Sequence, residues 1–130
     1  IGLAQLERLD GMLGDRRHVA SRYDEALAGI EGLGLPWDRD SWFVYVVQLP
    51  PGFDRDETIV ALRERGIASK PYLPAIHLMS FYRERFDHRE GEFPVCEDVA
   101  ARSVALPFFP ELSEGQIERV ARALRAVLER

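Results

Sequence analysis

Hydrophobic residues recur at three- and four-residue steps through the first part of the chain, with charged residues between them. This spacing places the apolar side chains on one side of a helix, so residues 3–31 are predicted to form a long amphipathic helix. Gly11 and Gly14 each cost about 1 kcal/mol relative to alanine in a helix interior. The helix is expected to end at Gly32 and Gly34.

The same spacing returns near the end of the chain and predicts a helix over residues 113–128. Ser113 and Gln116 form a capping-box pattern, in which each side chain bonds to the backbone of the other residue at the start of a helix. The apolar stripe of this helix consists of Ile117, Val120, Ala121, Leu124, Val127 and Leu128.

Runs of β-branched and aromatic residues predict the strands. The clearest run covers residues 41–49 and ends at Pro50 and Pro51, which cannot donate hydrogen bonds to a neighbouring strand. Shorter strands are expected at 67–72 and at 104–109, where flanking prolines limit the pairing.

Two further helices are expected between these strands. Asp54 is a suitable N-cap and Gly66 a suitable left-handed stop for a helix over 55–65. A helix over 94–103 begins with a proline, which fits the first helical position. The segment 71–82 contains prolines at short intervals and is expected to be an ordered loop.

The predicted order is helix, strand, helix, strand, loop, helix, strand, helix. This order indicates an α+β fold in which helices pack on one face of a small sheet. A chain of 130 residues has room for one hydrophobic core, so residues 1–130 are expected to form a single domain.

Charge and composition narrow the functional classes. The net charge is −5 and charges of both signs alternate along the helices, so the sequence has no basic footprint for nucleic acid. No apolar run reaches the roughly 18 residues of a membrane helix. The single cysteine and three histidines lack the spacing of metal ligands. We therefore expect a cytoplasmic protein with no metal site, no nucleic-acid partner and no membrane partner.

The densest cluster of reactive polar groups runs from Lys70 to His77, with Tyr82 just beyond it. Lys70 is the only lysine, and a desolvated lysine could form a Schiff base; a solvated or ion-paired lysine is the simpler interpretation. His77 could act as a general acid or base, or donate a hydrogen bond to a phosphate; a structural histidine is the simpler interpretation. Tyr72 and Tyr82 bracket His77 with hydroxyls and flat apolar faces, which favours ligand contact.

Other reactive side chains have ordinary interpretations. Cys96 with His77 could form a thiol nucleophile pair, but no spacing identifies an orienting Asn or Asp, and a small packed cysteine is the ordinary case. Four residues are interpreted as solvated surface: His18, His88, Glu90 and Glu92. The residues alone therefore indicate an α+β domain with one candidate ligand loop.

The segment from Gly66 to Leu78 reads Gly-Ile-Ala-Ser-Lys-Pro-Tyr-Leu-Pro-Ala-Ile-His-Leu. It resembles the part of the DegT/DnrJ/StrS sugar aminotransferase family in which a strand leads into Tyr-x-Pro-x-x-His-Leu. The chain departs from the family where Ala68-Ser69 replaces a common Gly-Thr and Met79-Ser80 a common Gln-Pro. Other similar stretches follow in the family's order: residues 1–6 with Leu9-Asp10, Arg16-Arg17, Ala20 with Tyr23, Phe93-Pro94-Val95, Leu106-Pro107-Phe108-Phe109, and Leu112-Ser113 with Gln116 and Val120.

The resemblance implies the fold of the C-terminal small domain of aspartate-aminotransferase-type (fold type I) enzymes, with a small antiparallel sheet of about three strands and helices on one face. It implies that a larger N-terminal domain, absent from this chain, carries pyridoxal 5'-phosphate on a Schiff-base lysine. This chain would then have no catalytic and no cofactor-binding residue. It would be inactive alone and would bind no cofactor by itself.

The resemblance also implies an activity for the complete enzyme, in which an amino group passes from glutamate to a nucleotide-linked keto-deoxysugar. Such reactions serve amino-deoxysugar, polysaccharide or antibiotic sugar biosynthesis. Lys70, Tyr72, His77 and Tyr82 would line the substrate side of the site, and the enzyme would be a homodimer.

Two alternatives stay open. The chain could be a non-catalytic α+β module for ligand binding or oligomerisation that retains the small-domain fold, or a hydrolase built on Cys96. An isolated domain is also expected to self-associate through the apolar stripe of its first helix.

Overall fold

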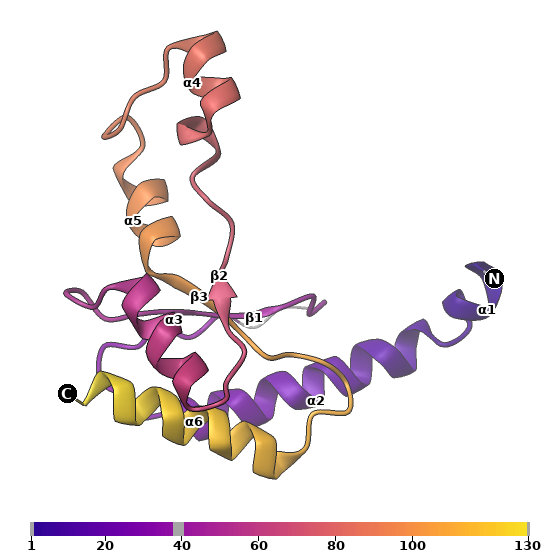
Figure 1. Ribbon diagram of the computed structural model, residues 1–130. Helices are drawn as coiled ribbons and strands as arrows, with labels where there is room; N and C mark the ends of the chain where they lie inside the picture. The colour runs from indigo at the N-terminus through magenta and orange to yellow at the C-terminus, as the bar shows by residue number, and fades with distance from the viewer. Residues whose placement is uncertain (1, 38–40, 130) are drawn as a thin grey trace.

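The computed structural model describes residues 2–37 and 41–129, which form a three-stranded antiparallel sheet with helices around it (Figure 1). The strand order is β1-β3-β2, so the last strand in the sequence lies in the middle of the sheet. Tyr45 of β1 lies opposite Leu106, and Lys70 of β2 lies opposite Ala105. The strands are β1 (Tyr45–Gln48), β2 (Lys70–Pro71) and β3 (Ser103–Leu106).

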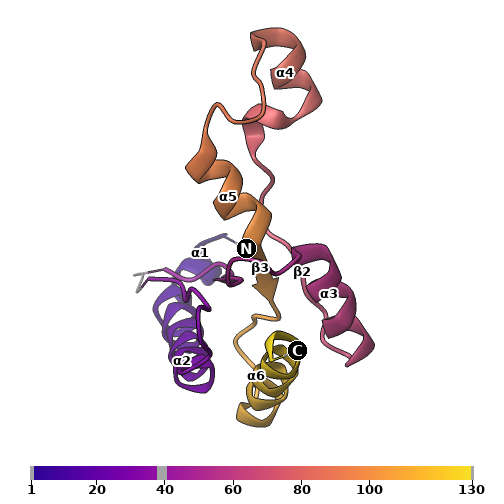
Figure 2. The same ribbon diagram turned by 90° about the vertical axis from the view of Figure 1, so that its left-hand side faces the viewer.

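Three helices cover one face of this sheet, with α6 between α2 and α3 (Figure 2). They are α2 (Leu9–Leu27), α3 (Arg55–Glu64) and α6 (Glu114–Leu128). In each helix the apolar residues recur every three or four positions and therefore lie on one side. In all three helices this side packs into one core with the strands. The fully buried members of that core include Leu27, Leu62 and Leu124 from the helices and Val47 and Val104 from the strands.

On the other side of the sheet the chain rises into a projecting arm, which we define as residues 76–102 (Figures 1 and 2). The arm turns back on itself and returns directly into β3. The guanidinium of Arg102, at the base of the arm, donates to the carbonyl of Leu49 at 2.7 Å and pairs with Asp98. The arm contains the 3-10 turn η1 (Ile76–Leu78), α4 (Ser80–Phe86) and α5 (Pro94–Arg102).

The expected fold class is confirmed, and so are two helix N-caps and one helix stop. The side chain of Asp54 accepts a hydrogen bond from the Glu57 N–H at 2.8 Å at the start of α3. Gly66 after that helix has φ +75°, the left-handed region that glycine adopts at no steric cost. Ser113 and Gln116 form the expected capping box at the start of α6.

The long first helix was predicted wrongly in two respects. It is divided into α1 (Gly2–Leu6) and α2, and α2 ends before Gly29, whose φ is +81°, not at Gly32 and Gly34. Leu3 and Leu6 are exposed, so their side chains bury no apolar surface that would stabilise one continuous helix through the break. Ile1, where the family-like stretch begins, lies outside the described residues.

The segment 71–82 was also predicted wrongly, because it contains η1 and the start of α4 as well as loop. The strands are shorter than expected: β2 has two residues, and β3 ends before Pro107, which has no N–H to donate. α5 ends at Arg102 because Ser103 already has the extended backbone of β3.

Replacing Ser113 with alanine is expected to lower the free energy of unfolding by about 1 kcal/mol, the usual worth of a helix N-cap. The Ser113 hydroxyl accepts the backbone N–H of Gln116, and the side-chain amide oxygen of Gln116 accepts the Ser113 N–H at 2.9 Å. Urea denaturation followed by circular dichroism measures the effect. Ser21→Ala, an exposed position inside α2, is the matched control; equal effects of the two substitutions would contradict the prediction.

Candidate functional site

A mostly apolar groove of about 1030 Å³ lies where the arm leaves the sheet. It is lined by the segment that follows β2 and by one side of α5. Three of the four candidate residues, Tyr72, His77 and Tyr82, line this groove, although they lie on three different segments. The turn of the chain at η1 therefore brings them together.

The fourth candidate residue, Lys70, lies on the edge strand β2 beside a second cavity of about 740 Å³. Its side chain is exposed. Tyr72 lines both cavities, and its N–H donates to the Ser103 carbonyl at 3.3 Å, which continues the pairing of β2 with β3. Lys70 and Tyr72 thus present a cation and a phenol along one edge of the sheet.

Tyr82 stands on α4 among other exposed rings. Its ring lies edge-on to Phe81 at 5.3 Å and is stacked on Phe86 at 6.2 Å between centroids. None of the seven residues of α4 is buried. The aromatic side chains of this helix are therefore available to a ligand or to another part of a larger protein.

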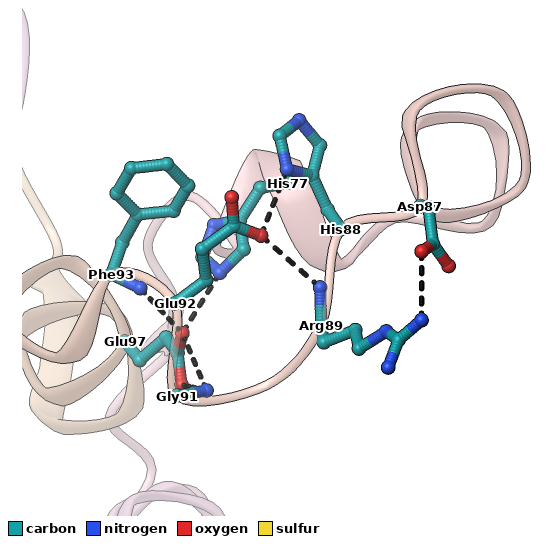
Figure 3. Close-up of polar contacts among 8 residues, drawn as sticks. All are labelled: His77, Asp87, His88, Arg89, Gly91, Glu92, Phe93 and Glu97. Atoms are coloured by element: carbon teal, nitrogen blue, oxygen red, sulfur yellow. Dashed lines mark hydrogen bonds and ion pairs between the residues drawn. The ribbon is translucent and has the colours of Figure 1, made fainter.

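His77 differs from the other candidates because it is buried and already has a partner. Only 9% of the residue is exposed, and its ring Nε2 lies 2.9 Å from Oε1 of Glu97 in the first turn of α5 (Figure 3). The Phe93 ring meets the imidazole edge-on at 4.8 Å. His77 therefore joins the rising segment of the arm to its returning segment.

Glu97 holds more than the histidine. Its carboxylate also accepts the N–H of Gly91 at 2.8 and 3.0 Å and the N–H of Phe93 at 3.2 Å (Figure 3). The hydrogen bond from Gly91, followed by that from His77, holds the pKa of Glu97 below its ordinary value. One carboxylate thus connects η1, the loop before α5 and α5 itself.

A second histidine and glutamate pair lies next to the first. His88 Nδ1 is 2.9 Å from Oε2 of Glu92, which also accepts the Arg89 N–H at 3.3 Å (Figure 3). The hydrogen bond from His88 lowers the pKa of Glu92. Arg89 pairs with Asp87 at 2.7 Å, and Asp87 ends α4 in the left-handed region with φ +55°.

The arm is expected to loosen in acid. A group whose pKa is lowered by folding stabilises the fold above its ordinary pKa, and that contribution disappears as the pH falls through the lowered value. For Glu97 the ordinary value is 4.5, so protection of the Gly91 and Phe93 amides from hydrogen exchange should fall as the pH drops below it.

In Glu97→Gln the acid dependence of these two amides should be absent, because the replacement does not titrate. Protection in the unsubstituted chain that stays constant well below pH 4.5 would contradict the assignment of Glu97 as the group that holds this loop.

The two acids that organise this site, Glu92 and Glu97, were not predicted as site residues. Glu92 is exposed, as the interpretation as solvated surface predicts, and His88 is half-buried. Their bond to each other was not predicted, and their spacing of four residues was the available signal. Glu97 lies 20 residues from His77, so no local pattern identifies it. Cys96 is exposed and lines the groove, but the Nε2 of its supposed partner His77 is bonded to Glu97.

Within residues 2–37 and 41–129, no group of three or more His, Cys, Asp and Glu residues is placed to hold a metal ion. No helix in the same ranges is long and apolar enough to cross a membrane.

The chain is similar to known proteins over nearly its whole length. The sequence profile of the DegT/DnrJ/EryC1/StrS aminotransferase family matches residues 1–125. The spore coat polysaccharide biosynthesis protein SpsC of Bacillus subtilis (strain 168) is 32% identical over an alignment of 137 residues, gaps included. The alignment covers 99% of this chain and 35% of SpsC.

Solved structures agree with these sequence matches. The aminotransferase TlmJ from Streptoalloteichus hindustanus is 31% identical with a TM-score of 0.83, over 98% of this chain and 35% of that one. DesI, whose structure was determined in the presence of its TDP-sugar product, is 26% identical with a TM-score of 0.84, over 99% of this chain and 34% of DesI. The chain therefore spans about a third of the length of the relatives it matches.

Proposed function

The chain belongs to the DegT/DnrJ/EryC1/StrS aminotransferase family, and we propose that it is the C-terminal small domain of a pyridoxal-phosphate-dependent sugar aminotransferase. One observation carries this proposal. Sequence and fold agree over 98–99% of this chain with proteins of which it covers only about a third. A domain of a larger enzyme produces this pattern of coverage.

The complete enzyme would transfer an amino group from glutamate to the keto group of a nucleotide-linked deoxysugar. The TDP-sugar product of the related DesI supports a substrate of this class. The exposed rings of Tyr82, Phe81 and Phe86 support a further part of the proposal, that the enzyme works as a homodimer in which other protein covers the arm.

The residues of this chain do not fit the cofactor itself. A lysine that holds pyridoxal phosphate needs an acid near the pyridine nitrogen and donors for the phosphate. Lys70 is the only lysine. Among the residues that the structure describes, the cavity beside it is lined by apolar residues, Ser69 and Tyr72, without an acid or an arginine. We therefore assign no step of the amino transfer to this chain and propose that the remainder of the enzyme binds the cofactor.

The proposed role of this chain is to bind and orient the sugar nucleotide. The ammonium group of Lys70 would pair with the diphosphate, because charge-assisted hydrogen bonds to phosphate are among the strongest available. Tyr72, between the two cavities, would contribute its hydroxyl, and Tyr82 the face of its ring. His77 would line the same groove in the orientation that Glu97 imposes.

The test is made on the product of the complete reading frame, supplied with pyridoxal phosphate, glutamate and a panel of nucleotide-linked keto sugars. Mass spectrometry should detect conversion of one keto sugar to the amino sugar, with formation of 2-oxoglutarate. Binding of keto sugars without any conversion would instead favour the non-catalytic module.

A further inference from the structure

We propose that Glu97 is the positioning residue of the substrate groove, because it fixes the proton of His77 on Nε2 and leaves Nδ1 as a hydrogen-bond acceptor for the substrate. No sequence pattern identifies Glu97, and its role follows from the contacts that its carboxylate on α5 makes with two other segments of the arm, η1 and the loop before α5. The kinetic part of the inference rests on the proposed function.

The position of the proton follows from what the carboxylate can accept. An ionised carboxylate has no hydrogen to donate, so every group bonded to it must be a donor. The N–H groups of Gly91 and Phe93 satisfy this condition. The lowered pKa of Glu97 is consistent with an ionised group. Nε2 of His77, at 2.9 Å, must therefore carry a proton.

In the neutral form of the imidazole, a proton on Nε2 leaves only a lone pair at Nδ1. The partner that suits this atom is a donor, such as a sugar hydroxyl, and not a phosphate oxygen. Among the described residues no hydrogen bond to Nδ1 of His77 is formed, and the ring lines the groove together with Tyr72 and Tyr82. This refines the earlier expectation that His77 donates to a phosphate.

The ring is also held against rotation. Phe93 lies edge-on to it at 4.8 Å and the His88 ring lies 6.1 Å away, while Glu97 fixes one nitrogen. Because Glu97 is bonded to the backbone of the loop that carries Phe93, the same carboxylate positions the histidine and the ring that packs on it.

The experiment uses the complete enzyme and reads the position of the His77 proton by nitrogen NMR. In the unsubstituted enzyme the proton should be on Nε2. In Glu97→Gln the amide oxygen should take the Oε2 position, which accepts the shortest backbone hydrogen bond, from Gly91 at 2.8 Å. The amide NH₂ then takes the Oε1 position, gives up the longer contact with the Phe93 N–H, faces His77 and moves the proton to Nδ1. A proton on Nδ1 in the unsubstituted enzyme, or no change in Glu97→Gln, would overturn the proposal.

Kinetics of the same variants separate positioning from a purely structural role. Glu97→Gln should raise the KM for the sugar nucleotide about tenfold with little change in kcat, as expected for loss of one hydrogen bond to bound substrate. His77→Gln keeps a donor near the Nε2 position but loses the acceptor, so it should keep the thermal stability and show the same rise. The double variant should show no further rise, because both changes remove one interaction.

Asp98→Asn is the matched control, since Asp98 follows Glu97 on α5 and pairs with Arg102. Its KM should be unchanged; an equal KM in Glu97→Gln and Asp98→Asn would overturn the proposal. If the enzyme aminated no keto sugar, the proposed function would fail, while the NMR result would still decide the role of Glu97.

Discussion

Replacing Tyr45 with alanine is expected to lower the free energy of unfolding by about 4 kcal/mol, the usual cost of removing a buried aromatic ring. Tyr45 has no exposed surface, and its ring is stacked on Tyr23 at 4.7 Å and on Trp42 at 5.7 Å between centroids. Its hydroxyl donates to Asp24 at 2.5 Å. The substitution removes the ring that joins α2 to β1.

The two buried phenols also explain the size of this effect. The Tyr23 hydroxyl donates to the Pro107 carbonyl at 2.7 Å, so the aromatic cluster connects α2 to the chain after β3. Burial raises the pKa of both Tyr23 and Tyr45, so both remain protonated donors. Loss of the central ring therefore leaves a cavity and an unpaired Asp24.

Urea denaturation followed by circular dichroism measures the change. Tyr45→Phe keeps the stacked ring and should cost only about 1 kcal/mol. The exposed neighbour Phe43 offers a control, because Phe43→Ala should change stability by less than about 0.5 kcal/mol. Equal effects of Tyr45→Ala and Phe43→Ala would show that the aromatic cluster does not hold the fold together.

Replacing Lys70 with alanine is expected to raise the KM of the complete enzyme for its sugar nucleotide about 10- to 100-fold, because a hydrogen bond to a charged group contributes about 1.5–3 kcal/mol. The effect should shrink in high salt, which screens an exposed charge. Steady-state kinetics at two ionic strengths measure both quantities. Lys70→Arg keeps the charge and should recover most of the affinity.

Arg63→Ala is the control, because it removes a comparable exposed charge from α3. Arg63 lines neither of the two cavities beside the candidate residues. Its KM should equal that of the unsubstituted enzyme. A KM for Lys70→Ala that matched this control would remove Lys70 from the proposed substrate site.

The elements that could be predicted from sequence are those whose signals are local. Asp54 and Ser113 cap their helices through residues three positions away, and the stripe of α6 faces one core. α4 could not be predicted because none of its residues is buried, so no periodic apolar pattern marks it. The end of α2 at Leu27, two residues before Gly29, was missed because several nearby glycines gave the same signal.

The candidate site could be predicted only in part. The cluster around His77 was visible as a sequence segment, and three of its residues line one groove. The partner of His77 was not visible, because Glu97 reaches it only after the arm has turned back. Long-range contacts of this kind depend on the path of the backbone and leave no mark in local spacing.

A structure of the complete enzyme with its aminated sugar nucleotide would show whether Lys70 and its neighbours bind the substrate. We expect a phosphate oxygen within hydrogen-bond distance of Lys70 Nζ, with Tyr72 or Tyr82 against the ligand. A sugar nucleotide bound without contact to residues 70–82 of either subunit would contradict it.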